Sequence, residues 1–182
     1  MSIKKMVIPV IKGVVPLLFT AALSVLSSVS FADSQMEVKI DVNLPASKDA
    51  SNYRPYVAVW IENDKGKVIK TVSVWRKEAD WLKDMRRWWR KAGRYDQGEL
   101  DAVTGATRRP GIHTLVWDGT DQEGNVIEPG NYIVNVEAAR EHGSRSWVRM
   151  PIKGADMEAG NKVYTTEAAE ELGAMTITVR HK

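Results

Sequence analysis

The segment Asp101-Ala-Val-Thr-Gly-Ala-Thr107 places hydroxyl side chains around a glycine and an alanine, and Arg108 and Arg109 follow it directly. A hydroxyl that carries a phosphoester must reach solvent, and small neighbours such as Gly105 and Ala106 let a modifying enzyme approach the backbone. Glycine can also adopt dihedral angles that are closed to other residues. Arginines can neutralise a phosphodiester by charge-assisted hydrogen bonds. These residue types therefore suit phosphoester chemistry on a hydroxyl.

The same segment resembles the pattern Asp-x-x-Ser/Thr-Gly-Ala-Ser/Thr of extracytoplasmic proteins that carry FMN through a phosphoester bond. In that class a magnesium-dependent flavin transferase takes FMN from FAD and attaches it to the last hydroxyl residue. The resemblance implies that Thr107 is the acceptor. It implies that the recognition elements are Asp101, Thr104, Gly105 and Ala106, and Arg108 and Arg109 would lie beside the phosphate. A tight loop entering a strand after Pro110-Gly111 would also explain these residue types, and it remains the alternative.

Other catalytic constellations are missing from the sequence. The histidines His113, His142 and His181 lie far apart without metal-ligand spacing, and the chain has no cysteine. There is no Gly-x-Ser-x-Gly elbow, P-loop or Gly-x-Gly-x-x-Gly motif. We therefore predict no catalytic residues and no metal site, and a hydrolytic enzyme is disfavoured.

A tryptophan-rich and arginine-rich helix is predicted over residues 78–92. Its apolar residues recur at spacings of three and four, namely Trp81, Leu82, Met85, Trp88 and Trp89. Trp88 and Trp89 point about 100° apart on a helix, so one can be buried while the other lies at the margin. The predicted partner-binding residues are Arg86, Arg87, Trp88, Trp89 and Arg90, as a docking surface for an anion, an acidic partner or membrane headgroups. A solvated face is the simpler explanation of the arginines.

Short β-rich runs separated by turn residues make up most of the remaining chain. The predicted strands cover 38–42, 56–61, 68–75, 112–117, 131–138, 146–152 and 175–180, with a further piece at 162–165. The runs 56–61 and 68–75 flank an Asn/Asp/Gly turn and predict a hairpin. Residues 94–109 are a polar connection. The pattern predicts an all-β fold, an antiparallel immunoglobulin-like β-sandwich with one inserted α-helix.

The stretch from His113 to Val134, with Trp117-Asp-Gly119 near its start, resembles the Trp-Asp-Gly hairpin of immunoglobulin-like domains such as that of the flagellar hook-cap protein. The resemblance implies that strand, turns and strand form one edge of the sandwich. The turn formers are Asp118, Gly119, Gly124 and Gly130. A calcium site built from Asp118, Asp121 and Glu123 is the less favoured alternative.

The N-terminus reads as a secretory signal peptide over residues 1–32, with basic residues, an apolar run and Ser30-Phe31-Ala32 as the cleavage site. Cleavage after Ala32 would leave residues 33–182 as a single domain in the periplasm, without stable membrane insertion. The alternative interpretation is an uncleaved membrane anchor. The chain has 26 basic and 23 acidic residues, and Lys4, Lys5 and Lys12 account for the excess. The mature part is therefore neutral, which disfavours nucleic-acid binding.

Over nearly the whole mature chain, the order of landmarks resembles a bacterial family of predicted periplasmic proteins, the domain of unknown function 2271. Those landmarks are residues 54–62, the 83–89 helix, residues 101–109 and Trp117-Asp-Gly119. Taken together, the sequence predicts a secreted accessory protein rather than a stand-alone enzyme. We expect an electron carrier with FMN on Thr107, served by a flavin transferase and a membrane oxidoreductase. A non-redox binding module is the alternative.

Overall fold

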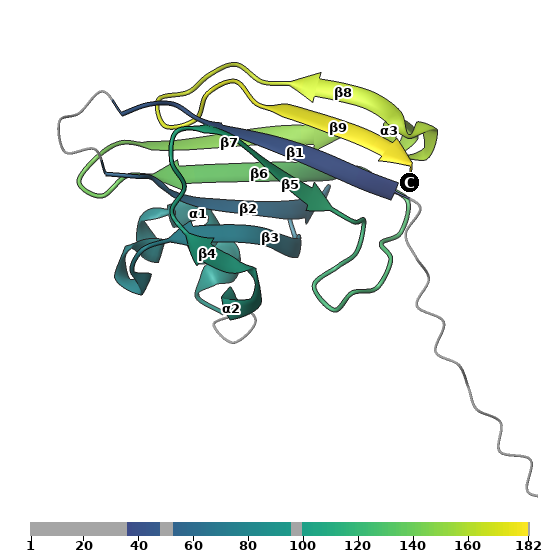
Figure 1. The fold of residues 1–182 in the computed structure, drawn as a ribbon. Coiled ribbons are helices and arrows are strands. Elements are labelled where there is room, and N and C mark those ends of the chain that lie inside the picture. The colour runs from purple at the N-terminus through teal and green to yellow at the C-terminus, as the bar shows by residue number, and fades with distance from the viewer. Residues whose placement is uncertain (1–35, 48–52, 96–99, 182) are drawn as a thin grey trace, which may run out of the picture. The chain divides into compact units, whose positions relative to one another are not determined.

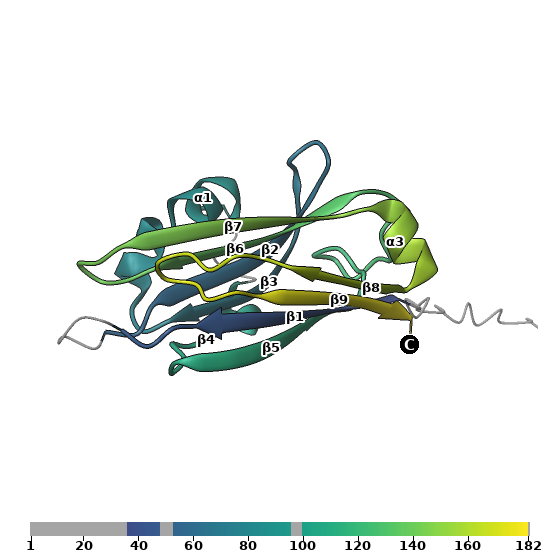
Figure 2. The same cartoon turned by 90° about the horizontal axis from the view of Figure 1, so that it is seen from above.

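The computed structural model describes residues 36–47, 53–95 and 100–181. The chain divides between residues 31 and 32 into two units, and all described residues belong to the second. That unit consists of two β-sheets packed face to face, with helical segments on the outer face of one of them (Figures 1 and 2). The predicted all-β sandwich is confirmed.

The first sheet has the strand order β5-β1-β9-β8. Its strands are β1 (Met36–Leu44), β5 (Gly111–Trp117), β8 (Asn161–Thr165) and β9 (Thr176–His181). All its pairings are antiparallel, and β1 lies between β5 and β9. Val38, Ile40 and Val42 are fully buried on one face of β1, as their alternation with polar residues predicts.

The second sheet has the order β4-β3-β2-β6-β7. Its strands are β2 (Tyr56–Asn63), β3 (Val68–Arg76), β4 (Thr104–Ala106), β6 (Tyr132–Ala139) and β7 (Arg145–Ile152). The predicted hairpin of β2 and β3 is present. β4 pairs in parallel with β3, whereas the other pairings of this sheet are antiparallel.

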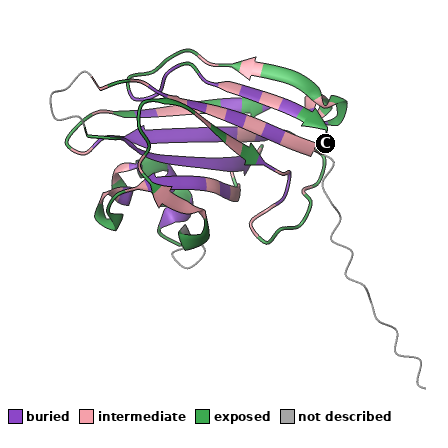
Figure 3. Cartoon of the chain, in the orientation of Figure 1, coloured by how far each residue is buried: buried purple, intermediate pink, exposed green. Residues whose placement is uncertain are grey.

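β2 is buried on both faces, which explains its continuous apolar run from Tyr56 to Ile61 (Figure 3). Val57, Val59 and Ile61 belong to the core between the sheets. Ala58 and Trp60 face the other way and pack in a second core beneath the helical segments. The second sheet is thus the middle of three layers.

The predicted single helix over 78–92 is instead a broken helical segment. It comprises a 3₁₀ helix η1 (Ala79–Asp84), then α1 (Arg86–Trp88), which continues into the π-helical turn η2 (Trp89–Gly93). Met85 separates the two parts with φ −78° and ψ 69°, outside the helical region. Two short helices, α2 (Leu100–Val103) and α3 (Gly154–Ala159), were not predicted.

The predicted Trp-Asp-Gly hairpin is wrong as a pairing of strands. β5 pairs with β1 in one sheet, whereas β6 pairs with β2 and β7 in the other. The segment between them therefore crosses from sheet to sheet. Its turns are present, because Gly119 and Gly124 have φ of 71° and 85°. Turn chemistry marks where a chain changes direction, but it does not determine which sheet the next strand joins.

Candidate functional site

The motif of residues 101–107 lies at the edge of the second sheet, on α2 and β4. Thr104, Gly105 and Ala106 are paired in register with Val74, Trp75 and Arg76 of β3. The Ser73 hydroxyl lies 3.5 Å from the carbonyl oxygen of Val103. The prediction of a polar connection over 94–109 is therefore wrong for this part of it, because the motif is held as a short helix and an edge strand.

Thr107 follows β4 and is partly exposed, between the exposed residues Ala106 and Arg108. Its position at the sheet edge leaves it within reach of solvent. The predicted neighbours Arg108 and Arg109 are both exposed. The hydroxyl residue and the two arginines that follow it in the sequence are therefore all at least partly exposed at the surface.

Gly105 has an extended backbone without a positive φ, so the expectation of special dihedral angles at this position is wrong. A Cβ atom built there would lie 3.8 Å from Arg108 Nη2 and 4.0 Å from Trp75 Cδ1, which are ordinary contacts. The fold therefore tolerates a side chain at this position. A requirement for glycine would have to come from another molecule that approaches the strand.

A small cavity of about 190 Å³ lies next to the motif. Its lining combines Asp101 and Thr104 of the motif with residues from β3 and the helical segment, namely Arg76, Ala79, Leu82, Trp89 and Gly93. Arg76 Nη2 lies 3.8 Å from Asp101 Oδ1. The chain thus places an indole, a guanidinium and the motif around one hollow.

Gly93 allows the indoles to pack beside this cavity. A Cβ atom at this position would lie 2.6 Å from Trp88 Cζ3 and 2.8 Å from Trp89 Cε3, closer than real Cβ atoms approach. Trp88 is fully buried, whereas Trp89 is only partly buried. The Trp88 indole therefore packs in the core, and the Trp89 indole forms part of the cavity wall.

Arg108 extends from the motif over the indole of Trp75. Its guanidinium carbon lies 5.7 Å from the ring centroid. The His113 ring meets the same indole edge-on at 5.4 Å, and its Nε2 lies 2.7 Å from the carbonyl oxygen of Arg109. These contacts tie the residues after Thr107 to β3 and β5.

A second hollow of about 360 Å³ lies along the helical segment and is lined mainly by basic residues. We call it the basic pocket; its lining residues are Lys83, Arg86, Arg87, Trp89, Arg90 and Arg145. Trp89 lines both this pocket and the cavity beside the motif. Trp88 is 0% exposed and presents no surface, so its assignment to the partner-binding residues is corrected.

Residues that the sequence reasoning did not single out organise the basic pocket. Glu137 of β6 is fully buried, and its Oε2 accepts hydrogen bonds from the backbone N–H groups of Arg87 and Trp88 at 3.0 and 2.9 Å. Its Oε1 accepts one from Arg145 Nη1 at 2.7 Å. The sequence does contain a signal for this role, because Glu137 is the one charged residue of the mostly apolar strand β6 and a buried charge requires partners.

The residues proposed for calcium binding form turns instead. Asp118 Oδ1 accepts hydrogen bonds from the Thr120 hydroxyl at 2.7 Å and from Lys70 Nζ at 3.2 Å. Asp121 Oδ1 accepts one from the backbone N–H of Asn125 at 2.8 Å. Within the described ranges, no group of three or more His, Cys, Asp or Glu residues is arranged to hold a metal ion.

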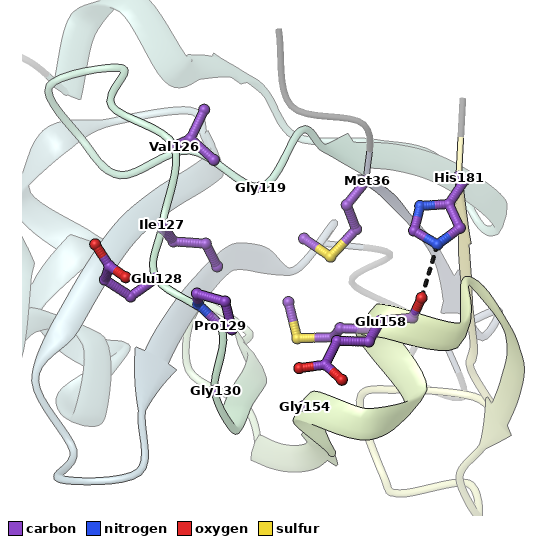
Figure 4. A pocket seen from close by; sticks show the side chains of 11 residues that line it. Met36, Gly119, Val126, Ile127, Glu128, Pro129, Gly130, Gly154, Glu158 and His181 are labelled. Atoms are coloured by element: carbon purple, nitrogen blue, oxygen red, sulfur yellow. Dashed lines mark hydrogen bonds between the residues drawn. The ribbon is translucent and has the colours of Figure 1, made fainter. Parts of the chain in front are cut away.

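A third cavity, of about 180 Å³, lies beyond the C-terminal end of β5, whereas the motif precedes that strand. The side chains of Met36, Ile127 and Pro129 surround it (Figure 4). His181 Nε2 lies 2.9 Å from the carbonyl oxygen of Glu158 at its margin. The lining is mainly apolar, and it shares no residue with the motif or the basic pocket.

Within the described part of the chain, no helix has the length and apolarity that a membrane span requires. No curated protein matches the sequence. Among solved structures, a C2 domain of plant Extended Synaptotagmin 1 is similar with a TM-score of 0.34 and 11% identity. The match covers 81% of this chain and 94% of that one.

The family model described as "Predicted periplasmic protein (DUF2271)" matches residues 37–174. This range includes both sheets up to the loop before β9, the helical segment and the motif. The predicted family is therefore confirmed, and its description agrees with the predicted periplasmic location, whereas the predicted signal peptide over residues 1–32 lies outside the described residues. The chain belongs to the DUF2271 family of predicted periplasmic proteins.

Proposed function

We propose that this periplasmic protein is an electron carrier that holds FMN through a phosphoester on Thr107. The observation that carries the proposal is the position of the complete Asp101–Thr107 motif on a partly exposed sheet edge beside a cavity walled by Trp89. The carrier would exchange electrons with a membrane oxidoreductase and would not turn over a substrate alone. Bound FMN would supply the redox chemistry.

The attachment step requires an accessible hydroxyl and a flavin transferase. The transferase would break the phosphoanhydride bond of FAD, join the FMN phosphorus to the Thr107 oxygen and release AMP, while the hydroxyl proton goes to solvent. Gly105 supports such recognition, because the fold itself leaves room for a larger residue there. Small side chains along β4 keep the strand open to an enzyme that must reach its backbone.

The chain's own residues would hold the attached group in two places. Arg108 and Arg109 lie directly beyond Thr107 and can donate charge-assisted hydrogen bonds to the phosphodiester. Trp89 and Arg76 line the adjacent cavity, where an indole can stack on an isoalloxazine ring. At about 190 Å³ the cavity is smaller than typical ligand pockets of roughly 300–1,000 Å³, so most of the flavin would remain exposed to a redox partner.

Intact-mass measurement tests the proposal directly. The protein is exported by a strain that contains a magnesium-dependent flavin transferase, and we expect an added mass equal to one FMN less one water, because the phosphoester forms with loss of the elements of water. Thr107→Ala should abolish the addition, whereas Thr107→Ser should keep it because the hydroxyl remains. Thr165→Ala, which removes an exposed threonine of β8, is the matched control and should stay modified.

An unmodified mass in every variant would refute the flavin proposal. Cytoplasmic expression is not a valid control, because the protein would not meet a transferase that works outside the cytoplasm. The remaining candidate would then be a non-redox binding module. The basic pocket favours that alternative, because it offers several cations around one hollow.

A further inference from the structure

We propose that the basic pocket is a binding site for a phosphate-bearing anion. The inference does not depend on flavin attachment at Thr107, because no motif residue lines this pocket. Four of its cations lie on the helical segment, with Lys83 on η1, Arg86 and Arg87 on α1 and Arg90 on η2, and the fifth, Arg145, comes from the distant strand β7. Folding therefore brings five positive charges to one hollow.

Three of these cations are held in place by contacts that leave donors available. Arg145 is fixed by Glu137 at 2.7 Å. The Arg87 guanidinium lies over the Trp147 ring at 4.4 Å from its centroid. Arg90 donates its Nε–H to the carbonyl oxygen of Arg86 at 3.1 Å, so its two terminal nitrogens are not used in that bond. Cations that are already positioned lose less conformational freedom on binding an anion.

Within the described ranges, carboxylates neutralise only a small part of the positive charge of the pocket. Among the described residues, only Arg145 of the five cations forms an ion pair, and its partner is the buried Glu137. Lys83, Arg86, Arg87 and Arg90 form none with any carboxylate in the described ranges. Like charges at short range repel one another, so a bound polyanion would relieve this repulsion.

Phosphate fits this arrangement better than a single carboxylate. Guanidinium groups bind phosphate through forked hydrogen bonds, and a phosphate offers oxygens in several directions to donors that surround it. A carboxylate presents two oxygens in one plane and would satisfy fewer of the five cations. A hollow of about 360 Å³ admits a diphosphate or a phosphodiester headgroup.

The test measures binding of inorganic pyrophosphate to the Thr107→Ala protein by calorimetry, so that the result is independent of flavin. We expect saturable binding with one site. Arg86→Glu combined with Arg90→Glu should weaken binding at least about tenfold, because two charge-assisted contacts are lost and two repulsive charges are gained. Circular dichroism checks that this variant is folded.

Lys153→Glu combined with Lys162→Glu is the matched control. It changes the net charge equally at two exposed positions outside the pocket, on the loop before α3 and on β8. This control should bind pyrophosphate within about twofold of the parent protein, since only long-range, screened electrostatics change. Equal weakening in both double variants would show unspecific charge attraction and overturn the proposal.

Two further probes identify the source of the phosphate group. Sedimentation with phosphatidylglycerol vesicles, compared with phosphatidylcholine vesicles, tests a lipid headgroup, whereas pyrophosphate in solution tests a soluble ligand. If the protein binds either the phosphatidylglycerol vesicles or pyrophosphate, and this binding is weakened by the double substitution of Arg86 and Arg90, the result supports the site. Absence of binding to both overturns it, and so does tighter binding of polyglutamate than of pyrophosphate, which would indicate an acidic protein partner instead.

Discussion

Glu137 links the core of the second sheet to the surface above it. It is a fully buried carboxylate whose oxygens accept backbone hydrogen bonds from the start of α1 and a side-chain hydrogen bond from Arg145 of β7. A buried carboxylate is tolerated when its lone pairs are used in this way. The same contacts fix two of the basic-pocket residues.

Glu137→Gln is expected to lower the free energy of unfolding by about 2 kcal/mol. The amide can still accept the backbone hydrogen bonds through its oxygen, but its NH₂ group would then face the Arg145 guanidinium. Urea unfolding measures the change. Glu123→Gln, at an exposed position, is the control and should leave stability within about 0.5 kcal/mol. Equal stability of both variants would contradict this role of Glu137.

At the scale of elements, the sequence predicts strands better than their partners. The alternation along β1 and the apolar run 56–61 of β2 both have a direct physical cause, namely burial of one face or of both faces. The hairpin between Trp117 and Val134 is wrong because local turn chemistry contains no information on which sheet a strand joins. β4 was missed because three residues including a glycine carry no periodic signal.

In the candidate site, too, local features could be predicted from the sequence, whereas contacts between distant segments could not. The motif and the cationic zone could be identified from residue types, and the proximity of Trp89 to the motif could be suggested from sequence distance. The contribution of Arg145 could not, because Arg145 reaches the helical segment through the pairing of β6 with β7. Long-range strand pairing is specified by packing rather than by local sequence.

Two glycines, Gly93 and Gly105, should differ in how far substitution by alanine lowers the melting temperature. Gly93→Ala is expected to lower the melting temperature by several degrees, because the new methyl group overlaps the rings of Trp88 and Trp89. Gly105→Ala should leave the melting temperature within about 2 °C, since its methyl group meets only ordinary contacts. Differential scanning fluorimetry provides the comparison. A larger loss in Gly105→Ala than in Gly93→Ala would disprove the packing argument.

On the scale of the whole molecule, acid stability depends on carboxylates on β1 and just after β5. Burial alone would raise the pKa of Asp118, but hydrogen bonds from Thr120 and Lys70 hold this pKa below its ordinary value. Burial alone would likewise raise the pKa of Asp41, but hydrogen bonds from Thr114 and Lys39 hold this pKa below its ordinary value. Both groups therefore release their protons more readily in the folded chain than in the unfolded chain.

A lowered pKa in the folded state means that the stabilisation is present above the unfolded pKa of about 4 and is lost as pH falls below it. We expect the melting temperature to fall between pH 5 and pH 3 less steeply in Asp41→Asn combined with Asp118→Asn than in the parent protein. Thermal melts across this range give the slopes. Identical slopes for the variant and the parent protein would show that these carboxylates do not contribute to the loss of stability at acidic pH.

The pairing of β1 with β9 joins the first and the last described strands of the chain. β1 is an inner strand, so the first sheet cannot close until β9 is available. In a protein that is exported from its N-terminal end, β1 would therefore wait on the far side of the membrane until translocation is almost complete. Its apolar face would meanwhile be open to chaperones, and any transferase that reads a folded surface would have to act after this late closure.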